Sequence, residues 1–207
     1  MSISDIKHMF MRMTADDDFP SEEINFGEPG EKGPSKGALR GTAYHRVFEL
    51  FDYDNVPDDK SNVSAMMDSM VEKGLLDEES KELVDASKIL VFAKSDLGRR
   101  MACAHKNGLL YREKPFVMGI PACAIDKDKY KSEELVVVQG IVDAWFEEDE
   151  GIVIVDYKTD NVARIEDLKA RYESQLVYYG EALEKVTGKP VKELVIYSVK
   201  FGESLSL

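Results

Sequence analysis

Hydrophobic residues recur every three or four positions through the first half of the chain, the spacing of helices that bury one face. The pattern predicts a helix over residues 39–53 and a charge-rich helical region over residues 61–105, within which Ser95 has the residue type of a helix cap. A short stripe over residues 3–13 also fits a helix. Residues 15–36 are acidic and rich in Gly and Pro, which favours a loop or linker.

The second half of the chain changes to patterns typical of strands. Near-continuous apolar runs favour strands that are covered on both faces. We expect one helix over residues 165–186 and strands over residues 109–120, 134–148, 151–159 and 193–201. This order predicts an α/β fold, a mixed central sheet flanked by helices with an N-terminal helical subdomain. The expected divisions are an N-terminal segment (1–36) and one domain (37–207) with a helical part (37–106) and a sheet core (107–207).

The composition is that of a folded protein. Of the 207 residues, 43% are hydrophobic and 32% are charged. No apolar run approaches the roughly 20 residues of a membrane span, and the N-terminus lacks a secretory signal, so we expect a cytoplasmic setting and no membrane partner. The two cysteines, Cys103 and Cys123, are too few for a four-cysteine iron–sulfur cluster and match no zinc spacing.

The formal net charge of −13 argues against a free-standing module that binds nucleic acid with its whole surface. It leaves room for a small catalytic site, because carboxylates that hold a divalent cation add to the acidic count. A larger partner would then supply the basic groove for nucleic acid.

Three charged residues lie where two predicted strands meet. Residues 134–148 and 151–159 nearly touch, so they should form a hairpin. A two-residue turn at positions 149 and 150 places Asp143 opposite Asp156, and a turn at positions 150 and 151 places it opposite Lys158. Because side chains alternate along a strand, either register puts all three on one face.

Two carboxylates this close repel each other unless a proton or a cation lies between them. Oxygen ligands suit Mg²⁺ or Mn²⁺, and a bound divalent ion lowers the pKa of its water and polarises a phosphoryl oxygen. Lys158 would stabilise developing negative charge, which fits phosphodiester hydrolysis. The simpler alternative is a solvated strand end, the usual meaning of a lone Asp-x-Lys.

Four further stretches carry a family resemblance. In chain order they are "GTAYHRVFE" (41–49), "QGIVDAWF" (139–146), "VDYKTD" (155–160) and "YESQLVYYGEAL" (172–183). Across residues 38–200 they resemble the motifs of the PD-(D/E)xK nuclease superfamily, within it the RecB-like branch. The nearest resemblance is to the C-terminal nuclease domains of AddA subunits in AddAB helicase-nucleases, and "YREKPF" (111–116) is similar to one strand of those domains.

The resemblance implies a restriction-endonuclease-like fold and a set of roles. His45, Asp143, Asp156 and the carbonyl of Tyr157 would hold Mg²⁺, with Mn²⁺ as a substitute. Lys158 would be the catalytic lysine, joined in the site by Asp143 and Asp156. Two residues on the helix over 165–186, Gln175 and Tyr179, would line the site and place the scissile strand, and Glu113 would be a supporting acidic residue.

The resemblance also implies partners. The substrate would be DNA, as single strands delivered by a helicase, in double-strand break repair and recombination, and the reaction an exonuclease reaction. The sequence holds no G-x-x-x-x-G-K-[ST] motif, so the helicase portion and the partner nuclease subunit would lie outside it. Two alternatives stay open: a nuclease fold kept only for docking or DNA guiding, and a metal-dependent hydrolase of another phosphate substrate.

Overall fold

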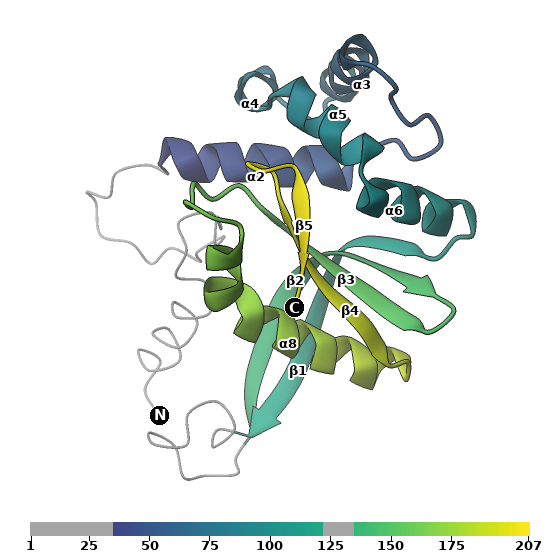
Figure 1. The fold of residues 1–207 in the computed structure, drawn as a ribbon, viewed down its shortest axis with the longest axis vertical. Helices are drawn as coiled ribbons and strands as arrows, with labels where there is room; N and C mark the ends of the chain where they lie inside the picture. Colours follow the sequence, from purple (N-terminus) through teal and green to yellow (C-terminus); the bar gives the residue numbers. More distant parts are fainter. Residues whose placement is uncertain (1–34, 122–134) are drawn as a thin grey trace.

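The computed structural model describes residues 35–121 and 135–207 (Figure 1). The predicted helix over residues 3–13 and nearly all of the predicted linker lie outside the described residues. The described elements are, in chain order, α2 (Lys36–Glu49), α3 (Lys60–Glu72), α4 (Glu78–Leu83), α5 (Ala86–Lys94), α6 (Asp96–Lys106), β1 (Leu110–Pro121), β2 (Leu135–Glu148), β3 (Gly151–Lys158), α8 (Glu166–Thr187), β4 (Val191–Ser198) and β5 (Glu203–Ser206).

Each of the helices α2 to α6 begins at a serine or an aspartate that caps it. The cap side chain accepts a hydrogen bond from a backbone N–H of the first turn, which has no partner inside the helix. The caps are Ser35, Asp59, Asp77, Asp85 and Ser95. Ser95, predicted as a cap, accepts from the N–H of Gly98 at 3.0 Å. Within the described ranges, no helix combines the length and the apolar character needed to span a membrane.

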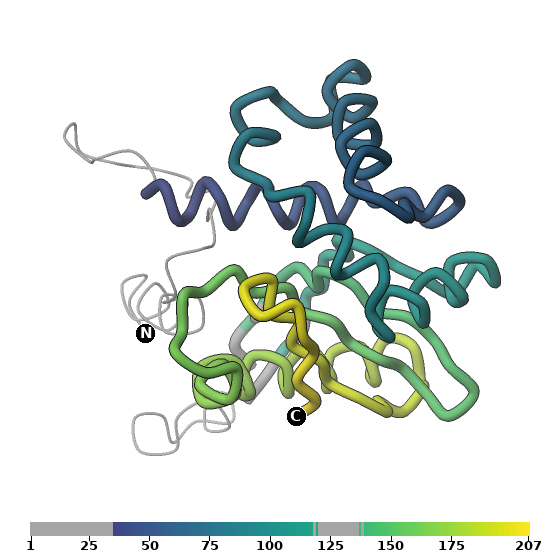
Figure 2. The backbone as a smooth tube through the Cα atoms, turned by 45° about the horizontal axis from the view of Figure 1, so that its top comes forward, coloured from purple at the N-terminus to yellow at the C-terminus, as the bar shows by residue number. Residues whose placement is uncertain are grey.

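The strands form one mixed sheet in the order β1-β2-β3-β4-β5. Strands β3 and β4 run parallel, and α8 connects them as a crossover, whereas the other neighbouring strands of the described sheet run antiparallel. Helices α2 to α6 lie on one side of the sheet and α8 on the other (Figures 1 and 2). The predicted fold, a mixed sheet with flanking helices, is confirmed.

The alternation of β3 explains why its apolar run is unbroken. All eight residues of β3 are buried. Val153, Val155 and Tyr157 join the core under α2 to α6, whereas Ile152 and Ile154 join the core under α8. A strand that is covered on both faces needs apolar side chains at successive positions, as in a parallel sheet. The helical part and the sheet share the first of these cores.

The end of the chain differs from the prediction. The strand expected over residues 193–201 covers Val191–Ser198, and residues after Ser198 form a turn in which Gly202 donates its N–H to the Ser198 carbonyl at 2.8 Å. Strand β5 then pairs antiparallel with β4. It was not predicted, because its four residues are short, mostly polar and partly exposed, and so carry no periodic apolar signal.

The β2–β3 hairpin has the first of the two predicted registers. Glu148 pairs with Gly151 across a two-residue turn, and pairing continues to Ala144 opposite Val155. Gly151 has a φ of 143°, and a Cβ there would lie 2.3 Å from the carbonyl oxygen of Pro190. Only glycine therefore fits this turn. The next step along the two strands places Asp143 opposite Asp156.

The far end of this hairpin is held by a network of charges. Arg100 donates to both oxygens of Glu148, at 2.9 and 3.1 Å, and to Glu193 at 2.7 Å. Lys192 also contacts Glu148, at 2.9 Å. The hydrogen bonds from Arg100 lower the pKa of Glu148 from 4.5 to about 2, against the opposing effect of burial.

We expect Glu148→Gln to destabilise the fold at neutral pH and to have little effect in acid. A depressed carboxylate pKa contributes stability above the unfolded pKa, and that contribution is lost as the pH falls through the folded pKa. Because both side chains are about a quarter exposed, we expect a loss of about 1–2 kcal/mol at pH 7. Urea unfolding at pH 7, 5 and 3 measures it. A difference that does not shrink toward pH 3 would contradict the assignment.

Candidate active site

Asp143 and Asp156 lie buried where the pairing of β2 and β3 ends. Their exposed fractions are 3% and 1%. The N–H of Tyr157 donates to Oδ2 of Asp143 at 2.8 Å, which ties the end of β3 to the carboxylate of its neighbour. The opposition of the two acids that the sequence suggested is thus the geometry of the hairpin, and Tyr157 follows directly at the same strand end.

His45 approaches Asp143 from helix α2. Its Nδ1 lies 3.3 Å from Oδ1 of Asp143. The packing of α2 fixes the ring, because Phe48, one turn further on, stacks on Tyr157 of β3 with ring centroids 4.2 Å apart. Burial alone would lower the pKa of His45, but the Asp143 carboxylate outweighs it and raises the pKa to about 9. Burial likewise opposes ionisation of Asp143, and His45 and Lys158 lower its pKa on balance.

Asp156 pairs with Lys158 on its own strand. The two residues are two positions apart and share a face, with Nζ of Lys158 3.0 Å from Oδ2 of Asp156. Burial raises the pKa of Asp156 to about 6, with Lys158 opposing and Asp143 reinforcing the shift. Burial would lower the pKa of Lys158, but the carboxylates of Asp156 and Asp143 raise it on balance. Lys158 is therefore a charged ammonium inside the protein.

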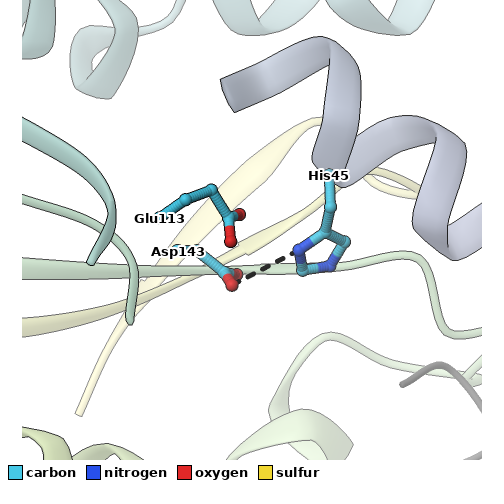
Figure 3. Close-up of side chains that lie close together, drawn as sticks. All are labelled: His45, Glu113 and Asp143. Carbon is cyan, nitrogen blue, oxygen red and sulfur yellow. Dashed lines mark ion pairs between the residues drawn. The ribbon is translucent and has the colours of Figure 1, made fainter. Parts of the chain in front are cut away.

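Glu113 on β1 is the third acidic residue that the fold brings to this point. Figure 3 shows its carboxylate beside Asp143 and His45. Burial, and then the charge of Asp143, raise the pKa of Glu113 to about 7. Its φ of 47° is the one positive value at a non-glycine residue in the described part of the chain. A side chain in this region costs about 1–3 kcal/mol and such residues cluster at functional sites.

These groups have the chemistry of a divalent-metal site. One ligand atom each from His45, Glu113 and Asp143 lie within 4.8 Å of one another. Apart from its ion pair with Lys158, the buried carboxylate of Asp156 has no hydrogen-bond partner among the described residues. A buried carboxylate is costly without partners. Three carboxylates and an imidazole suit Mg²⁺ or Mn²⁺ better than softer metals.

Gln175 and Tyr179 come to the site from α8. They lie one turn apart on the helix, and Nε2 of Gln175 donates to the Tyr179 hydroxyl at 2.6 Å. Burial, and then the charges of Asp156 and Asp143, raise the pKa of Tyr179. The structure therefore brings Tyr179 into the electrostatic field of the acidic pair, and Gln175 holds its hydroxyl.

The glycine of the "QGIVD" stretch makes room for this arrangement. A Cβ on Gly140 would lie 2.8 Å from Cε1 of Phe116 and 3.4 Å from Cε1 of Tyr179. The Phe116 and Tyr179 rings pack edge to face with centroids 5.3 Å apart. The bare backbone of Gly140 thus lets both rings approach β2.

We expect Gly140→Ala to destabilise the protein by about 1–3 kcal/mol, the usual cost of overpacking. The added methyl group displaces the Phe116 ring and, through it, Tyr179. Urea unfolding measures the cost, with Gly188→Ala as a control for the general effect of a new methyl group, since nothing lies within 4 Å of a Cβ at that position. Because Gly188 has a φ of 70°, its substitution reports backbone strain alone. An unchanged Tyr179 environment by NMR would contradict the displacement.

The sequence pointed to the main site residues, and the structure brings all of them to one end of the sheet. Glu113 had only its place in "YREKPF" to suggest it, and the structure places it in the group with His45 and Asp143. Tyr172 and Asp160 were assigned no role. Their signal was present in "DYKTD" and in the first letter of the helix motif, but neither stretch shows that the two side chains meet.

Comparisons with known proteins agree with this geometry. A family model described as the PD-(D/E)XK nuclease superfamily matches residues 23–204. The chain is 37% identical over 208 residues to the AddA protein of an ATP-dependent helicase/nuclease from Clostridium botulinum (strain 657 / Type Ba4), covering 95% of this chain and 16% of that protein. It is 34% identical over 212 residues to the protein of the same name from Lachnoclostridium phytofermentans, covering 86% and 15%. The chain thus spans about one sixth of the length of these curated relatives.

Proposed function

Because the chain belongs to the PD-(D/E)XK nuclease superfamily, as its motifs indicated, we propose that it is a metal-dependent deoxyribonuclease domain. It hydrolyses phosphodiester bonds in single-stranded DNA as an exonuclease, with Mg²⁺, or Mn²⁺ in its place. The observation that carries the proposal is the buried meeting of Asp143, Asp156 and Lys158 at the end of two strands, with Nζ of Lys158 3.0 Å from Asp156.

The ligand set combines residues from three elements. His45 of α2, Asp143 of β2 and Asp156 of β3 would hold the ion, with the carbonyl of Tyr157 as a backbone ligand. Glu113 supports this set from β1, since it lies in the same group as His45 and Asp143. When bound, the divalent ion supplies a water of lowered pKa and polarises the phosphoryl oxygen.

The remaining side chains act on the substrate. The Lys158 ammonium orients the attacking water or stabilises the negative charge that develops on the phosphoryl oxygens. Gln175 and Tyr179 line the site on the α8 side and position the scissile strand. Their mutual hydrogen bond, 2.6 Å long, fixes both polar groups before the substrate arrives, which reduces the reorganisation needed on binding.

The surroundings of this domain follow from its relatives. Both relatives are named as components of an ATP-dependent helicase/nuclease. We infer that a helicase portion delivers single strands to the site and that a partner nuclease subunit completes the assembly, in cytoplasmic double-strand break repair and recombination. The net charge of −13 supports this division, because an acidic domain gains little from phosphate contacts of its own.

The test is degradation of end-labelled linear single-stranded DNA at low salt, with Mg²⁺, with Mn²⁺ and with EDTA. We expect cleavage with either metal and none with EDTA. Covalently closed circular single-stranded DNA is the matched control, because an exonuclease leaves it intact. Duplex DNA and single-stranded RNA of the same sequence, run beside it, report the substrate preference.

Two results would overturn the proposal. Cleavage that persists in EDTA would remove the metal from the mechanism. A folded chain that neither cleaves DNA nor gains thermal stability from Mn²⁺ would favour a docking module instead. Addition of the helicase portion and its partner then separates a domain that needs delivery of its substrate from one without activity.

A further inference from the structure

The ring of Tyr172 lies against the ammonium of Lys158. Nζ of Lys158 is 3.9 Å from the centroid of that ring. A cation within about 6 Å of the face of an aromatic ring is attracted by the negative charge density of that face, most strongly away from water. Both side chains are buried, with exposed fractions of 5% for Lys158 and 4% for Tyr172. The contact therefore lies in surroundings where it is strong.

Tyr172 is in turn held by Asp160, which follows β3. The Tyr172 hydroxyl donates to Oδ1 of Asp160 at 2.9 Å. Arg171, the neighbour of Tyr172 on α8, donates to the same oxygen at 3.2 Å. The loop after β3 and the first half of α8 are thus fastened together by one carboxylate, two residues beyond Lys158.

Packing fixes the same ring from the other direction. Tyr172 belongs to a core cluster with Leu168 and Leu176 of α8, Ile196 of β4, and Val162 of the loop before α8. Leu168 and Ile196 are completely buried. A ring that is packed on its edges and hydrogen-bonded at its hydroxyl has little freedom to turn, so the surface that it offers to Lys158 is constant.

We propose that Tyr172 is a positioning residue for Lys158, its ring holding the ammonium beside Asp156 while Asp160 holds the ring. A lysine needs such a partner because its four-carbon stem has many rotamers, whereas catalysis requires one. Asp156 supplies a second fixed contact at 3.0 Å. The inference rests on the proposed function, since the position of Lys158 matters to the reaction only if Lys158 takes part in it.

The first test is independent of activity. NMR spectra of protein with ¹³C-labelled lysine show the ε-methylene protons of Lys158, identified by their loss in Lys158→Arg. We expect these protons to be shifted upfield by the Tyr172 ring in the wild type. The shift should persist in Tyr172→Phe, which keeps the ring, and disappear in Tyr172→Leu. An ordinary shift in the folded wild type would overturn the proposal, whatever the variants do.

The second test separates kcat from KM on single-stranded DNA. We expect Tyr172→Leu to lower kcat by about 10²-fold, the scale of a misplaced catalytic group, with KM near the wild-type value. Tyr172→Phe should restore most of kcat. Leu168→Val is the control for stability, because it loosens the same core cluster without removing the ring. An equal loss of kcat in Leu168→Val would reduce Tyr172 to a packing role and overturn the proposal.

The outcomes distinguish this inference from the function on which it rests. If Lys158→Ala abolishes cleavage but Tyr172→Leu cleaves at the wild-type rate, the nuclease stands and the positioning role fails. If Lys158→Ala cleaves like the wild type, the proposed role of Lys158 fails. In that case the NMR shift still decides whether Tyr172 holds the ammonium, because it requires no substrate.

Discussion

Lys158→Ala is expected to lower the rate of metal-dependent cleavage by about 10²- to 10³-fold or more, the cost of removing one group that stabilises transition-state charge. The ammonium is buried, and it lies 3.0 Å from Asp156. Water that fills the space left by the side chain cannot replace a fixed positive charge there. The measurement is the rate of degradation of end-labelled single-stranded DNA under saturating Mg²⁺.

The metal should still bind to this variant, since the proposed ligands are intact. We therefore expect Mn²⁺ to raise the melting temperature of Lys158→Ala as it does that of the wild type. Lys192→Ala is the matched control, because Lys192 also contacts carboxylates, at 2.9 and 3.3 Å, but near the beginning of β4. It should cleave normally. A wild-type rate in Lys158→Ala, or a comparable loss in Lys192→Ala, would remove Lys158 from the mechanism.

Asp156→Asn is expected to abolish cleavage and yet to stabilise the metal-free protein. In the fold, burial raises the pKa of Asp156 from 3.8 to about 6, even though Lys158 opposes the shift. A raised carboxylate pKa means that ionisation costs stability, which is present below the unfolded pKa and lost as the pH rises through the folded one. At pH 8 in EDTA, the free energy of unfolding should rise by about 1–3 kcal/mol.

Asp143→Asn is the matched comparison, and its effect on stability should have the opposite sign. The pKa of Asp143 is lowered in the fold, because His45 and Lys158 outweigh burial, so its charge stabilises the metal-free protein. Both variants should lose cleavage and the stabilisation by Mn²⁺. Urea unfolding at pH 8 and pH 4 measures the difference, and the gain in Asp156→Asn should vanish at pH 4. Equal signs for the two variants at pH 8 would contradict this assignment of the charges.

The comparison also refines the picture of two repelling carboxylates. Their charges are not equivalent: Asp143 is neutralised by His45 and by the N–H of Tyr157, whereas Asp156 relies on Lys158 alone among the described residues. The cost of the metal-free site therefore falls mainly on Asp156. A site that is destabilised without its ligand is common where function requires buried polar groups.

The sequence by itself determined the elements whose signal is local. The unbroken apolar run of β3, the alternation that puts Asp156 and Lys158 on one face, and the serine that begins α6 all follow from spacing within a few residues. The same holds for the four motifs, each contained in one element. These patterns sufficed to identify the fold and the principal site residues, because each depends on neighbours along the chain.

Tertiary structure alone decided what depends on distant parts of the chain. It chose between the two hairpin registers, placed Glu113 of β1 beside His45 of α2, added β5, and laid the ring of Tyr172 on Lys158. No spacing predicts these contacts, since they arise where packed elements of the sheet and of α8 meet. The sequence specifies which side chains are suited to the chemistry, and the packing of the core decides which of them come within reach of one another.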